Sequence, residues 1–184
     1  MNFIIYDVEA TCWRGRPPKG INEVIEIGAV KVNPYGEVIS SFCKFIKPSI
    51  NPQLSSFCKK LTHISQEDID RADNFKIVID QYKEWIGVDE EDYVLGAWGD
   101  FDKRIIRDNC ELHKIEVDWL EYYINIKSQY NTIKARTGKD QTGLKSTVKK
   151  EGFEFDGIHH RAISDAENLA KIFSKYIDEW IIIW

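Results

Sequence analysis

The sequence lacks long apolar segments and a basic start. Its 184 residues contain only short apolar runs, far below the ~20 residues that a membrane-spanning helix needs. Asp7 interrupts the apolar run that begins at Phe3, and no basic residue precedes it, whereas a signal peptide needs a basic start and a longer apolar stretch. We therefore expect no membrane partner and no signal peptide, and a cytoplasmic location.

Paired cysteine motifs are also missing. The four cysteines, Cys12, Cys43, Cys58 and Cys110, lie far apart and form no C-x-x-C sequence. The ligand spacing of a structural zinc site is therefore absent. Reduced thiols in a cytoplasmic protein are the simplest interpretation.

The composition is that of a soluble globular protein, with 43% hydrophobic and 30% charged residues. The length predicts one domain over residues 1–184. The net charge of −5 is unevenly distributed, because residues 127–150 carry seven basic side chains against one acidic side chain. Residues 13–20 add Arg14, Arg16 and Lys19 without an acid. These two segments form either a local footprint for a polyanion or ordinary solvated surface.

Three strands are predicted at the start of the chain, over residues 2–7, 23–32 and about 37–46. The first is a short apolar run that ends at an acid, which is typical of a buried strand. The sequence Asn33-Pro34-Tyr35-Gly36 has the pattern of a type I turn. The second and third strands therefore form a hairpin.

Helical patterns dominate the rest of the chain. Ser65 and Asp68 have the spacing of a short helix start, and Ser164 and Glu167 that of a capping box. Gly87 is placed to end a helix. The predicted helices cover residues 74–86, 103–112, 119–135, 143–150 and about 162–180, and a fourth strand covers residues 93–98. The pattern predicts one α/β domain with its strands first.

Two acids mark the end of the first predicted strand. Asp7 and Glu9 are two residues apart, so their side chains point to one face, with Cα atoms roughly 7 Å apart. Two carboxylates beside an apolar strand are costly unless a positive charge lies there. Oxygen ligands suit Mg²⁺ or Mn²⁺. Taken alone, the pair is more often a strand end that turns to solvent.

Further candidate groups follow the fourth strand and precede the last helix. Asp100 and Asp102 flank an aromatic residue, and His159, His160 and Asp165 lie at the start of the last helix. A histidine beside a metal-bound carboxylate is a candidate general base, because its unperturbed pKa of ~6.5 is near neutral pH. Each group alone has an ordinary structural interpretation.

Together these segments resemble, in order and spacing, the DEDDh 3′-to-5′ exonucleases of the ribonuclease H-like superfamily. The motifs are Asp7-Val-Glu9-Ala-Thr11, Phe101-Asp102 and His160-x4-Asp165. The segments beginning at Asn22 (Asn-Glu-Val-Ile-Glu-Ile-Gly-Ala) and Leu61 (Leu-Thr-His-Ile) are also similar to family sequences. The forms Ser56-Phe57-Cys58 and Trp98-Gly-Asp-Phe-Asp102 are closest to the Eri1- and KapD-like exoribonuclease branch.

The resemblance implies a fold and a role for each motif residue. The fold is a ribonuclease H-like mixed central sheet, with three antiparallel strands followed by alternating strands and helices, flanked by helices. Two divalent ions, Mg²⁺ or Mn²⁺, are held by four carboxylates, and a histidine takes a proton from the attacking water. The ligands are Asp7, Glu9, Asp102 and Asp165, and the base is His160. Residues that contact substrate are Thr11, Phe57 and Phe101. Apart from the resemblance, Arg14 and Arg16 lie a few residues past the metal-binding strand, so we expect them to border the site and to contact substrate phosphates.

We therefore expect a metal-dependent 3′-to-5′ exonuclease that acts on single-stranded 3′ ends, favours RNA over DNA and releases nucleoside 5′-monophosphates. The alternatives are a non-catalytic RNA-binding regulator with the same fold and a phosphodiesterase restricted to short oligonucleotides. The sequence departs from the family pattern at Asp100, an additional acid, and at His63, which replaces the usual glycine. It leaves the biological substrate and the oligomeric state open.

Overall fold

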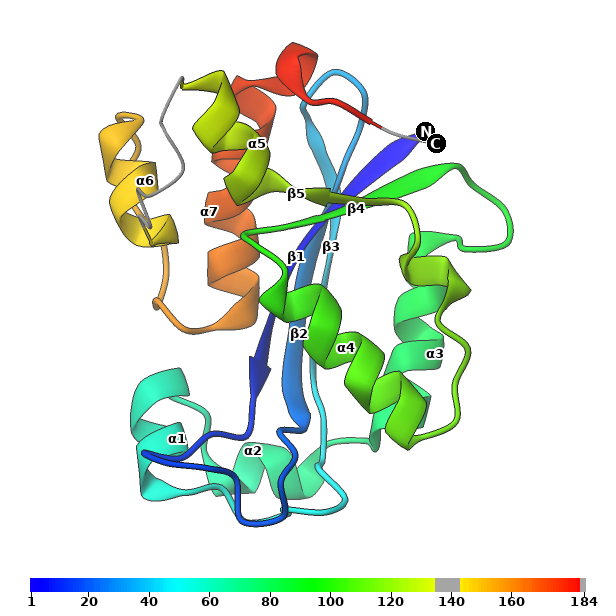
Figure 1. The fold of residues 1–184 in the computed structure, drawn as a ribbon, viewed down its shortest axis with the longest axis vertical. Coiled ribbons are helices and arrows are strands. Elements are labelled where there is room, and N and C mark those ends of the chain that lie inside the picture. The colour runs from blue at the N-terminus through cyan, green and yellow to red at the C-terminus, as the bar shows by residue number, and fades with distance from the viewer. Residues whose placement is uncertain (135–142, 183–184) are drawn as a thin grey trace.

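A computed structural model describes residues 1–134 and 143–182 (Figure 1). The strands are β1 (Asn2–Ala10), β2 (Val24–Val32), β3 (Val38–Phe45), β4 (Tyr93–Ala97) and β5 (Tyr123–Asn125). The α-helices are α1 (Ser56–Thr62), α2 (Gln66–Arg71), α3 (Phe75–Ile86), α4 (Phe101–Leu112), α5 (Ile126–Ile133), α6 (Leu144–Lys150) and α7 (Ala162–Lys175). Short 3₁₀ turns cover Asp118–Leu120 and Ile177–Glu179. No helix in these two ranges has the length and apolar character that a membrane crossing requires.

The five strands form one sheet in the order β3-β2-β1-β4-β5. β1 pairs with β2, and β2 with β3, in antiparallel register, whereas β1–β4 and β4–β5 are parallel. The crossovers to β4 and β5 contain helices, as parallel neighbours require. This is the mixed ribonuclease H-like arrangement that the resemblance implies.

Helices cover both faces of the sheet (Figure 1). Ile4, Tyr6 and Val8 of β1 belong to the core that includes residues of α3 and α4. Phe3 and Ile5 point the other way and belong to the core built with α5, α6 and α7. Because strand side chains alternate, Asp7 and Glu9 point to the same face of the sheet as Phe3 and Ile5. They follow these two apolar residues along β1.

Several local predictions are confirmed. Gly36 N donates to Asn33 O at 3.0 Å, which closes the turn between β2 and β3. Gly87 ends α3 in the left-handed region, at φ 80°, where a glycine avoids the steric cost that a Cβ imposes. Ser65 and Asp68 form a reciprocal capping box at the start of α2.

The helix predicted over residues 119–135 is wrong in its first part. Residues 118–120 form a 3₁₀ turn and Tyr123–Asn125 form β5, and a helix begins only at Ile126. Three residues are too few for strand periodicity, so β5 depends on pairing with β4. Residue 135 lies outside the described residues.

Two further differences concern helix starts. α1 is not predicted from the sequence, although Ser55 caps it by accepting from Cys58 N at 2.9 Å. The predicted capping box at Ser164 is wrong, because α7 already begins at Ala162. The Ser164 hydroxyl instead accepts from Ile158 N at 3.3 Å.

Candidate active site

Two of the predicted acids lie side by side on β1. Glu9 is 9% exposed and Asp7 is partly exposed. In the register with β2, Asp7 lies opposite Gly28, and Glu9 lies opposite Glu26. Strand alternation therefore aims both acids at the face that α7 covers.

Gly28 allows the first turn of α7 to touch the sheet beside Asp7. A Cβ built on Gly28 would overlap the backbone nitrogen of Ile163. The missing side chain thus sets the distance between β2 and α7. Asp165, two residues further along α7, comes over the acids of β1 as a result. Carboxylate oxygens of Asp7, Glu9 and Asp165 all lie within 4.8 Å of one another.

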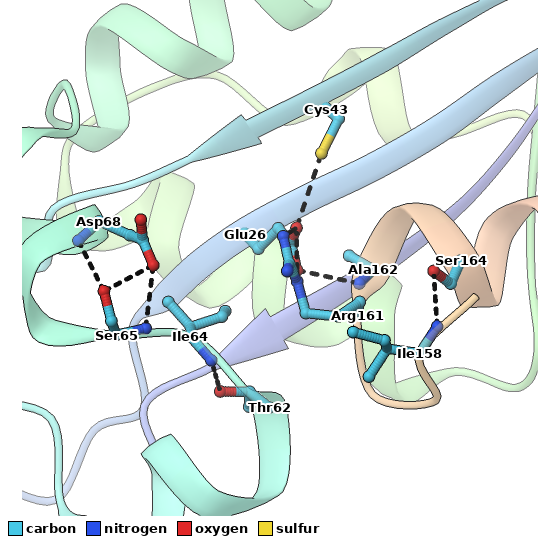
Figure 2. A network of polar contacts seen from close by, with 10 residues as sticks. All are labelled: Glu26, Cys43, Thr62, Ile64, Ser65, Asp68, Ile158, Arg161, Ala162 and Ser164. Atoms are coloured by element: carbon cyan, nitrogen blue, oxygen red, sulfur yellow. Dashed lines mark hydrogen bonds and ion pairs between the residues drawn. The ribbon is translucent and has the colours of Figure 1, made fainter.

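A buried ion pair fixes the start of α7 to β2 (Figure 2). Glu26 is fully buried, and Arg161 donates to it from Nε at 3.1–3.2 Å and from a terminal nitrogen at 2.8 Å. Ala162 N donates to the same carboxylate at 3.0 Å, and Cys43 Sγ from β3 lies 3.6 Å away. Paired and hydrogen-bonded charges offset the cost of burial. Glu26 therefore links β2 to the start of α7. The sequence analysis did not predict this role.

Asp102 reaches the same place from the first turn of α4. It is 6% exposed, and its Oδ1 accepts from Val8 N at 3.3 Å. α4 is also tied to β2 by buried Asn109, whose Oδ1 accepts from Val24 N at 3.1 Å. Asp100 is exposed and does not line the cavity at the acids. The structure therefore brings Asp102, and not Asp100, to the other acids.

These residues surround a cavity of about 290 Å³. Its lining consists of Asp7, Val8, Glu9, Trp98, Phe101, Asp102, Leu144, His159, His160 and Asp165. Phe101 lines this cavity and is 51% exposed. Part of its side chain is therefore accessible for the predicted contact with substrate. All five residues predicted for the catalysis thus share one cavity, although they come from three segments far apart in the sequence.

Both histidines before α7 take part in the site. His160 N donates to Asp165 Oδ2 at 2.9 Å, and His159 Nδ1 lies 3.1 Å from Asp165 Oδ1. The two imidazole rings stack at 4.0 Å between centroids. His160 has φ 67°, a conformation that is uncommon for a residue other than glycine. The contact of His159 with Asp165 was not predicted, because motif spacing selects His160 alone.

Burial and mutual repulsion shift the pKa values of the acids upward. Burial, with repulsion from the other acids, raises the pKa of Glu9 to about 9 and holds that of Asp7 well above its usual range. Burial also raises the pKa of Asp102, to about 7, and that of Asp165. For His160, burial and then the charge of His159 lower the pKa, with a smaller contribution in the same direction from His63. A neutral imidazole therefore faces carboxyls that resist ionisation.

The donor set fits divalent cations. No lysine or arginine in the described part of the chain forms an ion pair with Asp7, Glu9 or Asp102. Buried carboxylates without a cationic partner are costly, and clustered oxygen ligands are those that Mg²⁺ and Mn²⁺ prefer. The four acids are therefore suited to hold divalent metal.

The predicted substrate contacts separate into two places. Thr11 is 1% exposed, and its hydroxyl accepts from Glu23 N at 2.9 Å, so it joins β1 to β2 and does not line the acidic cavity. Phe57 and Arg14 line a second cavity, and exposed Arg16 lines neither cavity. That Thr11, Phe57, Arg14 and Arg16 contact substrate stays a prediction, and of the predicted substrate contacts only Phe101 lines the cavity at the acids.

Some basic side chains of the segment 127–150 make contacts within the fold. Lys134 Nζ lies 3.3 Å from Glu151, and Lys145 lies over the Phe155 ring at 5.6 Å. Arg136 and Lys139 lie outside the described residues. Leu144, at the start of α6, lines the acidic cavity, so the end of this segment reaches the site.

Residues 4–173 match the model of the family described as "Exonuclease". Human "3'-5' exoribonuclease 1" is 32% identical over 182 residues, which cover 95% of this chain and 52% of the human protein. The chain thus spans about half the length of this curated relative. The Schizosaccharomyces pombe "3'-5' exonuclease eri1" is 28% identical and is covered to 68%.

Solved structures show the same similarity. The nuclease domain of 3'hExo, a DEDDh family member bound to rAMP, superposes with a TM-score of 0.89 at 30% identity. That alignment covers 100% of this chain and 96% of the other chain. Escherichia coli Exonuclease I in complex with a dT13 oligonucleotide shares the fold, with a TM-score of 0.76 at 13% identity.

Proposed function

Because the chain belongs to the exonuclease family, in its DEDDh, Eri1-like branch, we propose that it is a metal-dependent 3′-to-5′ exonuclease. It removes nucleoside 5′-monophosphates from single-stranded 3′ ends. The observation that carries this proposal is the buried cluster of Asp7, Glu9 and Asp165, whose oxygens lie within 4.8 Å of one another, with Asp102 in the same cavity.

We assign the four acids to two divalent ions, Mg²⁺ or Mn²⁺. Asp7, Glu9 and Asp165 form the closest group, and Asp102 lines the same cavity. When bound there, two such ions would stabilise the attacking and the leaving oxygen of an in-line phosphoryl displacement and would offset the charge of the acids.

His160 is the general base in this mechanism. Its ring nitrogen takes a proton from the water that attacks the terminal phosphorus. The bond from phosphorus to the 3′-oxygen of the preceding nucleotide then breaks, and that oxygen takes a proton from solvent water. The lowered pKa of His160 favours the neutral ring that can accept a proton. Asp165 accepts from the backbone N–H of His160, and the His159 ring stacks on the His160 ring, so both contacts fix the position of this residue.

A preference for RNA over DNA is part of the proposal. It is supported by the human relative, named an exoribonuclease, and by the rAMP in the related nuclease domain. The exposed ring of Phe101 offers a stacking surface for a terminal base at the acids. Stacking accepts any base, so we expect little sequence preference.

The test uses RNA and DNA oligomers labelled at the 5′ or 3′ end. We expect 3′-labelled strands to release labelled mononucleotide at once, and 5′-labelled strands to shorten stepwise. Activity should require Mg²⁺ or Mn²⁺ and stop with EDTA. Cleavage of a circular RNA, or full activity in EDTA, contradicts the proposal.

The same experiment separates the two alternatives. A non-catalytic RNA-binding protein would bind the oligomers without degrading them under any metal condition. A phosphodiesterase restricted to short oligonucleotides would cleave dinucleotides and leave long strands intact. Comparison of a dinucleotide with a 20-residue strand distinguishes both from the proposed exonuclease.

A further inference from the structure

Two cysteines that play no part in the proposed reaction lie side by side at the end of β1. Cys12 follows β1 and is partly exposed, whereas Cys58 lies in α1 and is buried. Their thiols are hydrogen-bonded to each other. Figure 1 shows the loop after β1 next to α1 at the lower end of the molecule. The fold thus brings together two thiols from segments that are far apart in the sequence.

Backbone contacts hold the two sulfurs against each other. Cys58 Sγ lies 3.6 Å from Ala10 O, and it also accepts from the backbone N–H of Cys12. Ser55 joins the same two segments, because its hydroxyl donates to Cys12 O at 2.5 Å and accepts from Cys58 N at 2.9 Å. Cys12 also packs against the apolar cluster that contains Cys58. The contact between the thiols therefore depends on several parts of the fold and not on one flexible side chain.

This arrangement suits thiol–disulfide exchange. The hydrogen bonds from the thiol and from the N–H of Cys12 lower the pKa of Cys58 to about 7, although burial opposes this effect. The pair thus supplies a thiolate near neutral pH, which is the form that attacks a disulfide. Because Cys12 is partly exposed, a small molecule can reach it. Cys58 is shielded from solvent but in contact with the Cys12 sulfur, so it can displace a group bound there.

We propose that Cys12 and Cys58 form a reversible disulfide by reaction with a small disulfide such as oxidised glutathione, and that this bond lowers the activity of the site. Cys12 attacks the small disulfide, forms a mixed disulfide with it and releases one thiol. Cys58 then attacks the Cys12 sulfur, which forms the internal bond and releases the second thiol. The protons of the two protein thiols pass to the two released thiols. The protein pair is thereby oxidised and the small disulfide is reduced.

The bond acts on the strand end that carries Glu9. Two sulfurs in a disulfide are ~2.0 Å apart, closer than two hydrogen-bonded thiols. Ala10, whose carbonyl contacts Cys58, follows Glu9 directly, and the register with β2 shifts between Glu9 and Ala10. A displacement of about 1 Å can cost ~10²-fold in rate, so we expect oxidation to lower kcat by about 10- to 100-fold. This effect rests on the proposed exonuclease function, whereas formation of the bond does not.

Mass spectrometry tests the bond directly. The protein is equilibrated with oxidised and reduced glutathione in varied ratio, free thiols are blocked with N-ethylmaleimide, and the chain is digested. We expect a peptide pair linked through Cys12 and Cys58 that disappears after treatment with dithiothreitol. Cys12→Ser should remove this link, and the control Cys43→Ser should keep it, because Cys43 lies on β3 beside Glu26. Absence of the link in excess oxidised glutathione, or a link through Cys43 instead, overturns the proposal.

Activity on RNA oligomers is measured in parallel with reduced and oxidised protein, and thermal unfolding checks that both are folded. Oxidised wild type should lose kcat and recover it with dithiothreitol, whereas Cys12→Ser should keep the same kcat in both buffers. Unchanged kcat in linked protein, an equal loss in Cys12→Ser, or loss of the cooperative unfolding transition on oxidation overturns the proposed regulation. If the link forms reversibly but reduced protein degrades no RNA, the proposed function fails and the disulfide site stands.

Discussion

Replacement of Glu9 by glutamine tests whether the acidic cluster lowers the stability of the protein in the absence of divalent cations. Burial raises the pKa of Glu9 from 4.5 to about 9. Between these two pH values the folded protein holds a proton on Glu9 that the unfolded chain has released. A folded state that binds more protons loses stability as pH rises. Stability in EDTA should therefore fall from about pH 4.5 toward pH 9.

The magnitude follows from the same pKa values. Each pH unit above the ordinary pKa of 4.5 lowers the free energy of unfolding by about 1.4 kcal/mol. At pH 7 the total is about 3 kcal/mol, and glutamine, which is neutral in both states, avoids it. For a chain of this size we expect Glu9→Gln to raise Tm by about 6–12 °C at pH 7. At pH 5 the gain should be below about 1 kcal/mol.

The assay is thermal unfolding in EDTA from pH 5 to pH 8, repeated with Mg²⁺. The control is Glu116→Gln, because Glu116 is exposed and does not line the acidic cavity. Mg²⁺ should stabilise the wild type and have a smaller effect on Glu9→Gln. A lower Tm for Glu9→Gln at pH 8, or an equal gain at pH 5 and pH 8, would refute the reasoning.

Three further predictions test the site with single substitutions. His160→Ala should lower the single-turnover rate by about 10²–10⁴-fold while calorimetry still detects metal binding, and His159→Ala should cost less; equal losses would remove His160 from the role of base. Asp102→Ala should abolish activity in the oligomer assay, whereas Asp100→Ala should retain it, and the reverse result would mean that the wrong acid was chosen. Gly28→Ala should lower both Tm and metal affinity, because its Cβ overlaps the first turn of α7; wild-type values would show that the close approach is unimportant.

The three strands at the start of the chain and the shared face of Asp7 and Glu9 could be predicted, because both depend on local pattern. Asp7 and Glu9 share a face through the alternation of β1, which holds for any strand. The acids of α4 and α7 were predicted through resemblance to a family, since spacing alone does not bring distant segments together. Placement of Asp102 in the cavity, with Asp100 outside, agrees with the choice made from the motif.

The features that the sequence did not reveal depend on long-range contacts. β5 is three residues long and forms because it pairs with the edge of β4. In the sequence, Glu26 is an acid within an apolar strand without an evident partner. Its partner, Arg161 at the start of α7, is found only in the structure. For Thr11 the motif implied contact with substrate. In the structure its hydroxyl instead accepts a hydrogen bond from the backbone nitrogen of Glu23.

The ion pair between Glu26 and Arg161 also has a consequence for folding during protein synthesis. These two residues are separated by 135 positions, and chains are synthesised from the N-terminus at about 5–20 residues per second. Roughly 7–27 s therefore pass between the synthesis of Glu26 and that of Arg161, at this rate. During that interval the β1 acids exist without Asp165 and the histidines. The cavity of the proposed exonuclease is thus incomplete until the start of α7 has been made.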